Sequence, residues 1–297
     1  MNKDAFAAYH PSVNLLYFVM VIGFAMFFTH PVCLSLSFLG AFMYSVYLNG
    51  KKAVHSNLVY VLPIFIITAL LGPAFNHQGG TILTWLPGGN PLTLESILYG
   101  ISTAIMLITV ISWFSCFNTV MTSDKFVYLF GRILPALSLM LAVALRFVPR
   151  FREQVKVISN GQKCIGRLVS GGSLLQRINQ GVKILSIMVT WALENAIETA
   201  DSMRGRGYGL PGRTAFSVFS FRRRDAGALA FILLCSAIVL AGSVSGAYHF
   251  RYYPTVKGEW KGAATVAVFV AYFLLGAFPI ILNVKEELIW KSIKSKT

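Results

Sequence analysis

The chain has 297 residues, of which 56% are apolar and only 12% are charged. About a quarter of the residues in a soluble domain are charged, so this composition excludes a soluble globular protein and favours a polytopic membrane protein. The net charge of +15 could indicate nucleic-acid binding, but the basic residues alternate with apolar helix faces and show no aromatic stacking pattern. We therefore attribute the charge to the inner face of a membrane and expect no nucleic-acid partner.

Six apolar runs approach the roughly 17–25 residues that a helix needs to cross a lipid bilayer. They cover residues 13–29, 31–48, 58–75, 94–116, 226–247 and 263–282. Their interiors hold no Asp, Glu, Lys or Arg, although an ion-coupled carrier usually needs such a group. The sequence predicts an all-α polytopic membrane protein with about six transmembrane helices, and it disfavours a self-contained permease or an intramembrane enzyme.

The basic residues set the expected orientation. Residues 119–224 carry 16 of the 26 Lys and Arg residues, and such residues near membrane ends mark the cytoplasmic side. We expect N-terminal transmembrane helices over 1–118, a cytoplasmic helical insert over 119–224 and C-terminal transmembrane helices over 225–297. Both termini are then predicted on the cytoplasmic side of the cell membrane.

The insert is expected to be helical. The apolar run 133–145 is too short to cross a bilayer, and counting it as a span would put the basic insert outside, so we interpret it as a buried or interfacial helix. An apolar stripe from Arg150 onwards predicts a first long helix. Ser173 and Gln176 form a capping-box pattern that opens a second helix, which we expect to end near Met203, before a run of glycines.

An acidic stripe lies on the second helix. Glu194, Glu198 and Asp201 are spaced at i, i+4 and i+7, and like charges at this spacing repel one another. Either Arg204 partly neutralises a solvated stripe, or a neighbouring helix or a partner protein supplies the cation.

The clearest candidate for a binding site is the end of that helix, Arg204-Gly205-Arg206-Gly207. An Arg between two glycines can extend its guanidinium, with five N–H donors, towards a partner's carboxylate. The structural alternative is that the glycines cap the helix and the Arg complements the helix dipole.

No segment fits a catalytic or cofactor-binding motif. Asn49-Gly50-Lys51-Lys52 lacks the upstream Gly and the following Ser or Thr of a P-loop. The five His and four Cys residues are widely spaced, without the paired spacing of a metal site. We expect no catalytic residue, no cofactor and no metal ion in this chain.

The chain resembles the transmembrane T components of energy-coupling factor transporters, the family that includes EcfT and CbiQ. The resemblance extends over essentially the whole chain and rests on His10-Pro11 and on residues 145–149 and 203–208. It implies a membrane scaffold, itself not an enzyme, that joins two ABC-type ATPase subunits to a substrate-binding S component. Such transporters take up vitamins or transition-metal ions such as cobalt and nickel, and the scaffold passes ATP-driven movement to the S component.

The resemblance also implies an X-Arg-X motif at the end of each of two coupling helices, each held in a groove of one ATPase. Gly205-Arg206-Gly207 matches the second motif. The residues at the first position are Cys164, Ile165 and Gly166, where the family has Ala-Arg-Gly. Either Lys163 or Arg167 supplies the cation there, or this end docks through apolar contact.

Small residues recur in the last two apolar runs. Ala263, Ala267 and Ala271 repeat every four residues, as do Gly242 and Gly246. Close approach at small residues is a principal means of helix association in lipid. These strips either pack the last two spans onto each other or onto the first four, or they meet the S component or the long cytoplasmic helices.

Overall fold

The computed structural model of the chain describes residues 4–50, 59, 61–85, 90–131, 135–166, 173–211, 219–258 and 260–294. The chain forms two compact units. The first combines Met1–Thr122 with Phe219–Thr297, and the second is Ser123–Val218.

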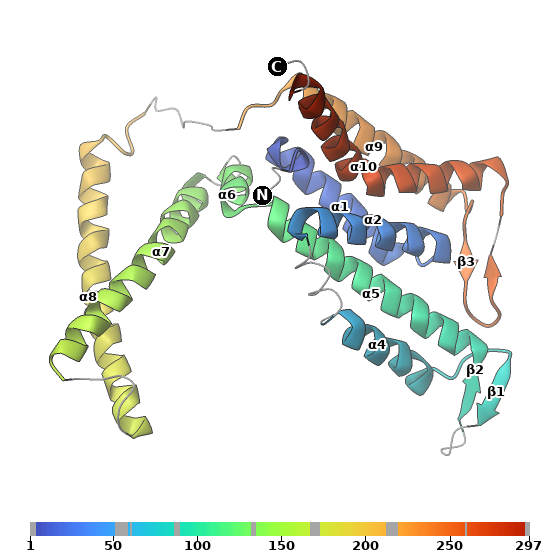
Figure 1. Cartoon of the computed structure of the whole chain (residues 1–297), viewed down its shortest axis with the longest axis horizontal. Coiled ribbons are helices and arrows are strands. Elements are labelled where there is room, and N and C mark those ends of the chain that lie inside the picture. Colours follow the sequence, from blue (N-terminus) through green and yellow to red (C-terminus); the bar gives the residue numbers. More distant parts are fainter. Residues whose placement is uncertain are drawn as a thin grey trace. The chain divides into compact units, whose positions relative to one another are not determined.

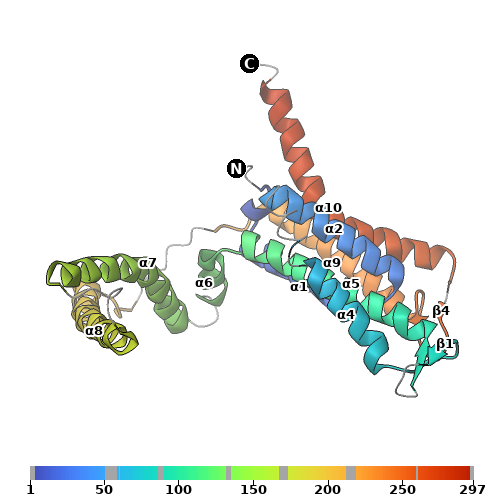
Figure 2. The ribbon, with the colours of Figure 1, turned by 60° about the horizontal axis from the view of Figure 1, so that its bottom comes forward.

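The first unit is a bundle of apolar helices (Figure 1). Its described helices are η1 (Phe6–Ala8), α1 (Pro11–Phe27), α2 (Pro31–Asn49), α4 (Leu62–Phe75), α5 (Leu94–Val120), α9 (Arg223–Val244) and α10 (Ala263–Lys294). Two antiparallel hairpins accompany them, β1 (Ile82–Trp85) with β2 (Pro91–Thr93) and β3 (Phe250–Arg251) with β4 (Lys257–Gly258). Figure 2 shows the last turns of α10 extending beyond the other helices of this unit.

Four described helices, α2, α5, α9 and α10, are long and apolar enough to cross a membrane. α1 and α4 are also apolar but have only 17 and 14 residues. Residues 58 and 60 of the third predicted run lie outside the described residues. The prediction of an all-α polytopic membrane protein is confirmed, with four helices of spanning length and two shorter ones in the described part of the chain.

α1 and α2 begin with the same cap. His10 and His30 are their N-caps, each followed by a proline at the first helical position. The ring Nδ1 of His10 accepts the Ser12 N–H at 3.3 Å, and that of His30 accepts the Val32 N–H at 3.2 Å. Burial lowers the pKa of both imidazoles, so the rings are neutral at pH 7 and can accept these bonds.

An aromatic core holds the first unit together. Trp113 of α5, Tyr17 of α1 and Tyr44 of α2 are fully buried, and the Tyr17 and Trp113 rings meet edge to face with centroids 6.0 Å apart. The Trp113 indole N–H donates to Ser37 Oγ at 3.0 Å. The buried ring is therefore both packed and hydrogen-bonded.

The residues before α1 join α2 to α10. The Tyr44 hydroxyl of α2 donates to Asp4 Oδ2 at 2.8 Å, and the Asn283 amide of α10 donates to Asp4 Oδ1 at 2.5 Å. The backbone N–H of Ala5 donates to Asn283 Oδ1 at 2.6 Å. Asp4 thus links two helices that are far apart in the sequence.

The same N-terminal segment is tied to the start of α9 by Asp225, which is only 1% exposed. Asp225 accepts the backbone N–H of His10 at 3.2 Å and that of Arg222 at 2.8 Å. The Arg224 guanidinium donates to the Ala8 carbonyl at 2.7 Å. A buried carboxylate is costly unless donors satisfy it, and these bonds place donors from two segments around Asp225.

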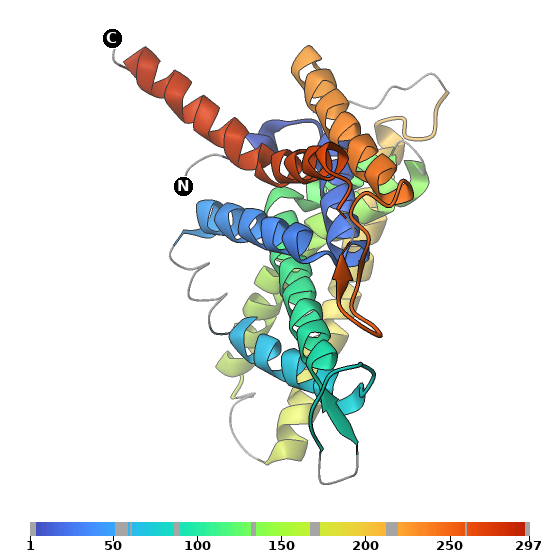
Figure 3. The ribbon, with the colours of Figure 1, turned by 90° about the vertical axis from the view of Figure 1, so that its right-hand side faces the viewer.

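α4 lies along α5 (Figure 3) and contacts it at two glycines. A Cβ added to Gly100 would lie 2.8 Å from the Ala69 carbonyl oxygen, and one added to Gly72 would lie 2.6 Å from Gly100 Cα. Among the described residues of α4 no side chain is buried. The attachment of α4 therefore depends on close backbone approach.

We expect Gly100→Ala to weaken the α4–α5 contact, because the added Cβ has no room and overpacking of this kind costs about 1–3 kcal/mol. The melting temperature of the purified protein in detergent should fall. Gly227→Ala in α9 is the matched control, since its Cβ would meet nothing within 4 Å. Equal melting temperatures of the two variants would contradict the glycine contact.

The described helices of the second unit are α6 (Ser123–Gly131), α7 (Pro135–Cys164) and α8 (Leu174–Gly205). The prediction of separate helices before and after Arg150 was wrong, because α7 is continuous and contains Pro149. One proline removes a single backbone hydrogen bond, and the helical turns on both sides of it keep α7 continuous. α8 begins after Ser173 as predicted, with the Ser173 N–H bonded to Gln176 Oε1 at 3.1 Å.

Candidate docking ends of the two long helices

α7 and α8 cross near their midpoints (Figures 1 and 2). The Phe151 ring of α7 meets the Trp191 ring of α8 edge to face, with centroids 5.8 Å apart. The Arg150 guanidinium lies 5.8 Å from the centroid of the same indole. Aromatic pairs contribute about 0.5–1.5 kcal/mol and exposed cation–π contacts about 0.5–1 kcal/mol. These contacts fix where the two helices cross.

The C-terminal ends of α7 and α8 lie at opposite ends of the crossed pair (Figure 1). At 1.5 Å per residue, α7 extends about 21 Å from Phe151 to Ile165, and α8 about 22 Å from Trp191 to Arg206. The second unit therefore has two helical arms of nearly equal length, each ending in exposed residues.

The end of α8 is a Schellman motif. Gly207 has a φ of +75°. Its N–H donates to the Arg204 carbonyl at 2.8 Å, and the Tyr208 N–H donates to the Met203 carbonyl at 2.9 Å. These two bonds define the motif and satisfy carbonyls of the last turn. Arg206 is thus the C-cap residue, and it is exposed.

The two glycines beside Arg206 have different roles. Gly207 lies in the left-handed region, which side chains other than glycine rarely adopt. Gly205 belongs to the last helical turn, and a Cβ added there would meet nothing within 4 Å. Helix capping explains Gly207, but the fold gives no reason for a glycine at position 205.

The end of α7 shares the left-handed glycine and its hydrogen bond to the carbonyl three residues earlier. Gly166 has a φ of +76°, and its N–H donates to the Lys163 carbonyl at 3.0 Å. The residue before this left-handed glycine is Ile165, whose side chain is 67% exposed. Cys164 is also exposed. Arg167 lies outside the described residues.

The left-handed glycines align the two ends in sequence. Gly166 corresponds to Gly207, Ile165 to Arg206, Cys164 to Gly205 and Lys163 to Arg204. The first end presents an apolar side chain where the second presents a guanidinium. Lys163 is exposed beside it and offers a cation two positions earlier.

All three residues of the acidic stripe on α8 are exposed. Arg204 lies 4.0 Å from Asp201, and both side chains are more than two-thirds exposed. Such a pair contributes little to stability. In the described part of the chain neither Glu194 nor Glu198 forms an ion pair, so two of the three carboxylates face solvent.

α8 also exposes a row of apolar side chains. Ile178, Val182, Leu185 and Val189 are each at least half exposed and follow one another at helical spacing. The described residues leave this row uncovered. An apolar row of this length is a candidate contact surface for another protein.

Some residues of the predicted small-residue strips are packed in the core, and others are exposed. Ala271 of α10 is 4% exposed and lies in the core, whereas Ala263 and Ala267 are exposed. α9 and α10 instead approach closely at Gly242, where the Val268 side chain leaves no room for a Cβ. Internal packing thus accounts for Ala271 and leaves the other two alanines uncovered.

One buried acid was not singled out in the sequence. Glu95, in the first turn of α5, is 3% exposed and accepts hydrogen bonds from the backbone N–H and the hydroxyl of Thr81. An acid just after the N-cap Thr93 is a recognisable helix-start signal. Within the described ranges, no group of three His, Cys, Asp or Glu side chains is placed to hold a metal ion.

Comparison with known proteins identifies the family. Residues 6–216 match CbiQ, a family described as cobalt transport protein. The chain belongs to this family. The predicted resemblance is thereby confirmed for a segment that includes both helix ends.

Relatives named as the energy-coupling factor transporter transmembrane protein EcfT are also similar to the chain. The protein of Bacillus selenitireducens is 30% identical over 196 residues, which are 62% of this chain and 73% of the relative. That of Streptococcus equi is 29% identical over 216 residues, or 68% and 76% of the two chains. That of Lactobacillus helveticus is 32% identical over 105 residues, or 35% and 38%. This T component is a non-catalytic, multi-pass membrane subunit.

We expect Gly207→Ala to fray the last turn of α8, because the left-handed conformation costs a residue other than glycine about 1–2 kcal/mol. Hydrogen exchange at the Gly207 and Tyr208 amide positions should accelerate about tenfold. Gly205→Ala is the matched control, and it should leave exchange unchanged or slower, since Ala favours a helix by about 1 kcal/mol over Gly. Equal exchange in both variants would refute the capping role of Gly207.

Proposed function

We propose that this chain is the coupling subunit of an energy-coupling factor uptake transporter. It transmits the ATP-driven movement of two cytoplasmic ATPase subunits to a separate, substrate-binding S component. The observation that supports this most directly is the pair of helix ends, which each have an exposed residue before a left-handed glycine and extend about equally from a common crossing. Two related ATPases offer two equivalent grooves, and two equivalent ends suit them.

Arg206 is the strongest docking residue in this proposal. The Schellman bonds satisfy the backbone around it, so its side chain is free of any capping task. Gly205 leaves space beside it, which explains a glycine that the fold does not need. A groove wall of an ATPase can then approach the last turn of α8 closely, and a carboxylate in that groove can accept two N–H bonds from the guanidinium.

In this proposal the apolar row on α8 contacts the S component. Closing of the ATPase pair draws the two docked ends together, and the crossing of Phe151 with Trp191 makes the helices move as a pair. The row Ile178, Val182 and Leu185 lies between the crossing and the start of α8, where such a movement is passed on to a bound membrane protein. The acidic stripe near the other end of α8 is a second contact for basic groups of a partner.

The proposed orientation follows from charge. The basic insert 119–224 lies in the cytoplasm and both termini are inside, because Lys and Arg concentrate on that side of membrane proteins. A vitamin or a transition-metal ion is the expected cargo class. The S component recognises the cargo, so this chain needs no catalytic group, metal ion or cofactor of its own.

We expect Arg206→Ala to abolish coupled uptake while the membrane bundle stays folded. A charge-assisted hydrogen bond contributes about 1.5–3 kcal/mol. The apparent affinity for the ATPases, measured by co-purification, should therefore fall about 10- to 150-fold. Arg206→Lys should rescue poorly, because an ammonium cannot make the forked contact. Lys183→Ala, which removes an exposed cation from the middle of α8, is the control. If the Arg206→Ala variant takes up substrate normally in membranes where the ATPases are limiting, the docking role of Arg206 is excluded.

The Ile165→Arg variant places an arginine at the end of α7, as Arg206 does at the end of α8. If the ATPase groove at this end is apolar, the variant should reduce ATPase co-purification at least tenfold, because burying an unpaired guanidinium is costly. If the groove is acidic, assembly should be retained or improved. Ile165→Ala, Lys163→Ala and Arg167→Ala complete the series. Unchanged assembly in all four variants would show that the end of α7 does not dock.

A further inference from the structure

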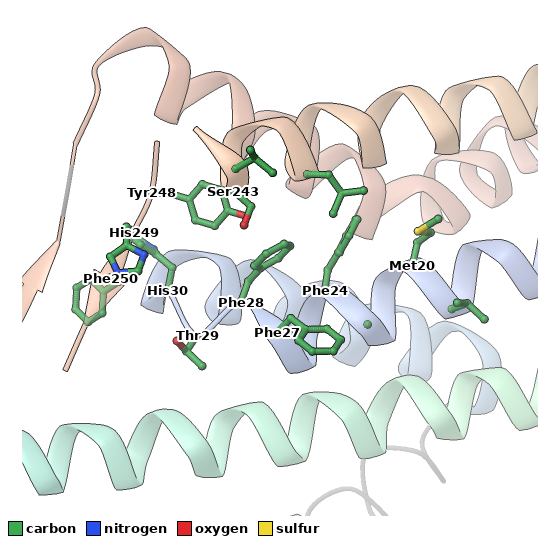
Figure 4. A pocket seen from close by; sticks show the side chains of 14 residues that line it. Met20, Phe24, Phe27, Phe28, Thr29, His30, Ser243, Tyr248, His249 and Phe250 are labelled. Carbon is green, nitrogen blue, oxygen red and sulfur yellow. The ribbon is translucent and has the colours of Figure 1, made fainter. Parts of the chain in front are cut away.

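A groove of 620 Å³ lies between α1 and α9 in the first unit (Figure 4). Its apolar walls are formed by Met20, Gly23 and Phe24 of α1 and by Leu240 and Val244 of α9. A Cβ added to Gly23 would meet nothing within 4 Å. The glycine therefore opens the groove without being needed for helix packing.

A row of aromatic rings forms part of the groove lining. The Phe24 and Phe28 rings lie 5.3 Å apart, and the Phe28 and Tyr248 rings meet edge to face at 5.4 Å. Figure 4 shows Phe24 and Phe28 rising from α1 towards α9. Because these rings support one another, the groove is a formed feature of the bundle.

One end of the groove is polar. Thr29, His30, Ser243 and His249 gather where α1 and α9 end. His30 Nδ1 accepts the Val32 N–H, so the neutral ring carries its proton on Nε2 and offers a donor there. The groove is thus apolar along the helices and rich in hydrogen-bonding groups at one end.

The rim of the groove is exposed and apolar. Phe27 is 82% exposed and Val244 is 90% exposed. Lipid tails are as apolar as these side chains, so an exposed apolar rim suits contact with the bilayer.

The volume of the groove lies within the roughly 300–1,000 Å³ of sites that bind small molecules. Its apolar walls and polar end match the acyl chain and the head group of a lipid.

We propose that this groove binds one membrane phospholipid, with an acyl chain lying along Gly23 and Phe24 and the head group at His30 and Ser243. The phosphate or ester oxygens of the head group accept hydrogen bonds from these two side chains. The proposal is independent of the ATPases and of the coupling role, because it rests on the first unit alone.

Native mass spectrometry of the full chain in detergent tests this proposal, with dioleoylphosphatidylethanolamine added as the probe. The wild type should retain one lipid that survives delipidation and rebinds. Gly23→Leu should weaken that binding at least tenfold, because the new side chain enters the groove. Gly227→Leu is the matched control, since it places the same side chain in open space on α9, and it should bind as the wild type does. Ser243→Ala should weaken binding several-fold by removing a head-group contact.

A wild type that retains no lipid, or equal binding by Gly23→Leu and Gly227→Leu, would overturn the proposal. Val19→Trp, from a position that is 56% exposed on the same wall, provides a second block if Gly23→Leu fails to fold. Loss of the S component from the purified complex in Gly23→Leu, without any change in lipid binding, would assign the groove to a protein helix instead.

Discussion

The two carboxylates that bind the N-terminal segment fix the architecture of the first unit. Asp4 connects this segment to α2 and α10, and Asp225 connects it to the start of α9. A carboxylate taken out of water needs several donors to offset its desolvation. Tyr44 and Asn283 supply them at Asp4, and backbone N–H groups supply them at Asp225. Helices distant in the sequence are thus joined through hydrogen bonds to these two carboxylates.

The proposed coupling role needs long helices with exposed ends, and the second unit has both. Its helices are long, and their crossing combines an aromatic pair with a cation above the Trp191 ring. Their ends are closed by left-handed glycines, which satisfy the backbone and leave the preceding side chain exposed. Such an end loses little conformational entropy when it enters a groove, because its backbone is already fixed.

The chemical difference between the two ends bears on their partners. In the proposed docking, Arg206 needs an anion and Ile165 an apolar wall, although a left-handed glycine follows each of them. Identical ATPases would offer identical grooves, so the difference favours either two different ATPases or an end of α7 that binds through Lys163. The proposed lipid groove is a separate feature, since it is formed by membrane helices alone.

The sequence by itself determined the membrane class, the basic insert, the start of α8 and the docking candidate at Arg206. These follow from composition, charge and capping residues, which act locally along the chain. It did not separate the roles of Gly205 and Gly207, because the sign of φ depends on where the helix stops. The family resemblance already placed Ile165 at the position of the motif arginine, and the structure adds that a left-handed glycine follows it, as one follows Arg206.

Only the tertiary structure decided which small residues are covered. Ala271 is buried and Ala267 is exposed, although both belong to one four-residue repeat. The repeat fixes which residues share a helix face, but the neighbouring helix fixes how far along that face the contact extends. The groove between α1 and α9 was invisible in the sequence for the same reason, since Gly23 and Val244 become neighbours only when the bundle brings distant helices together.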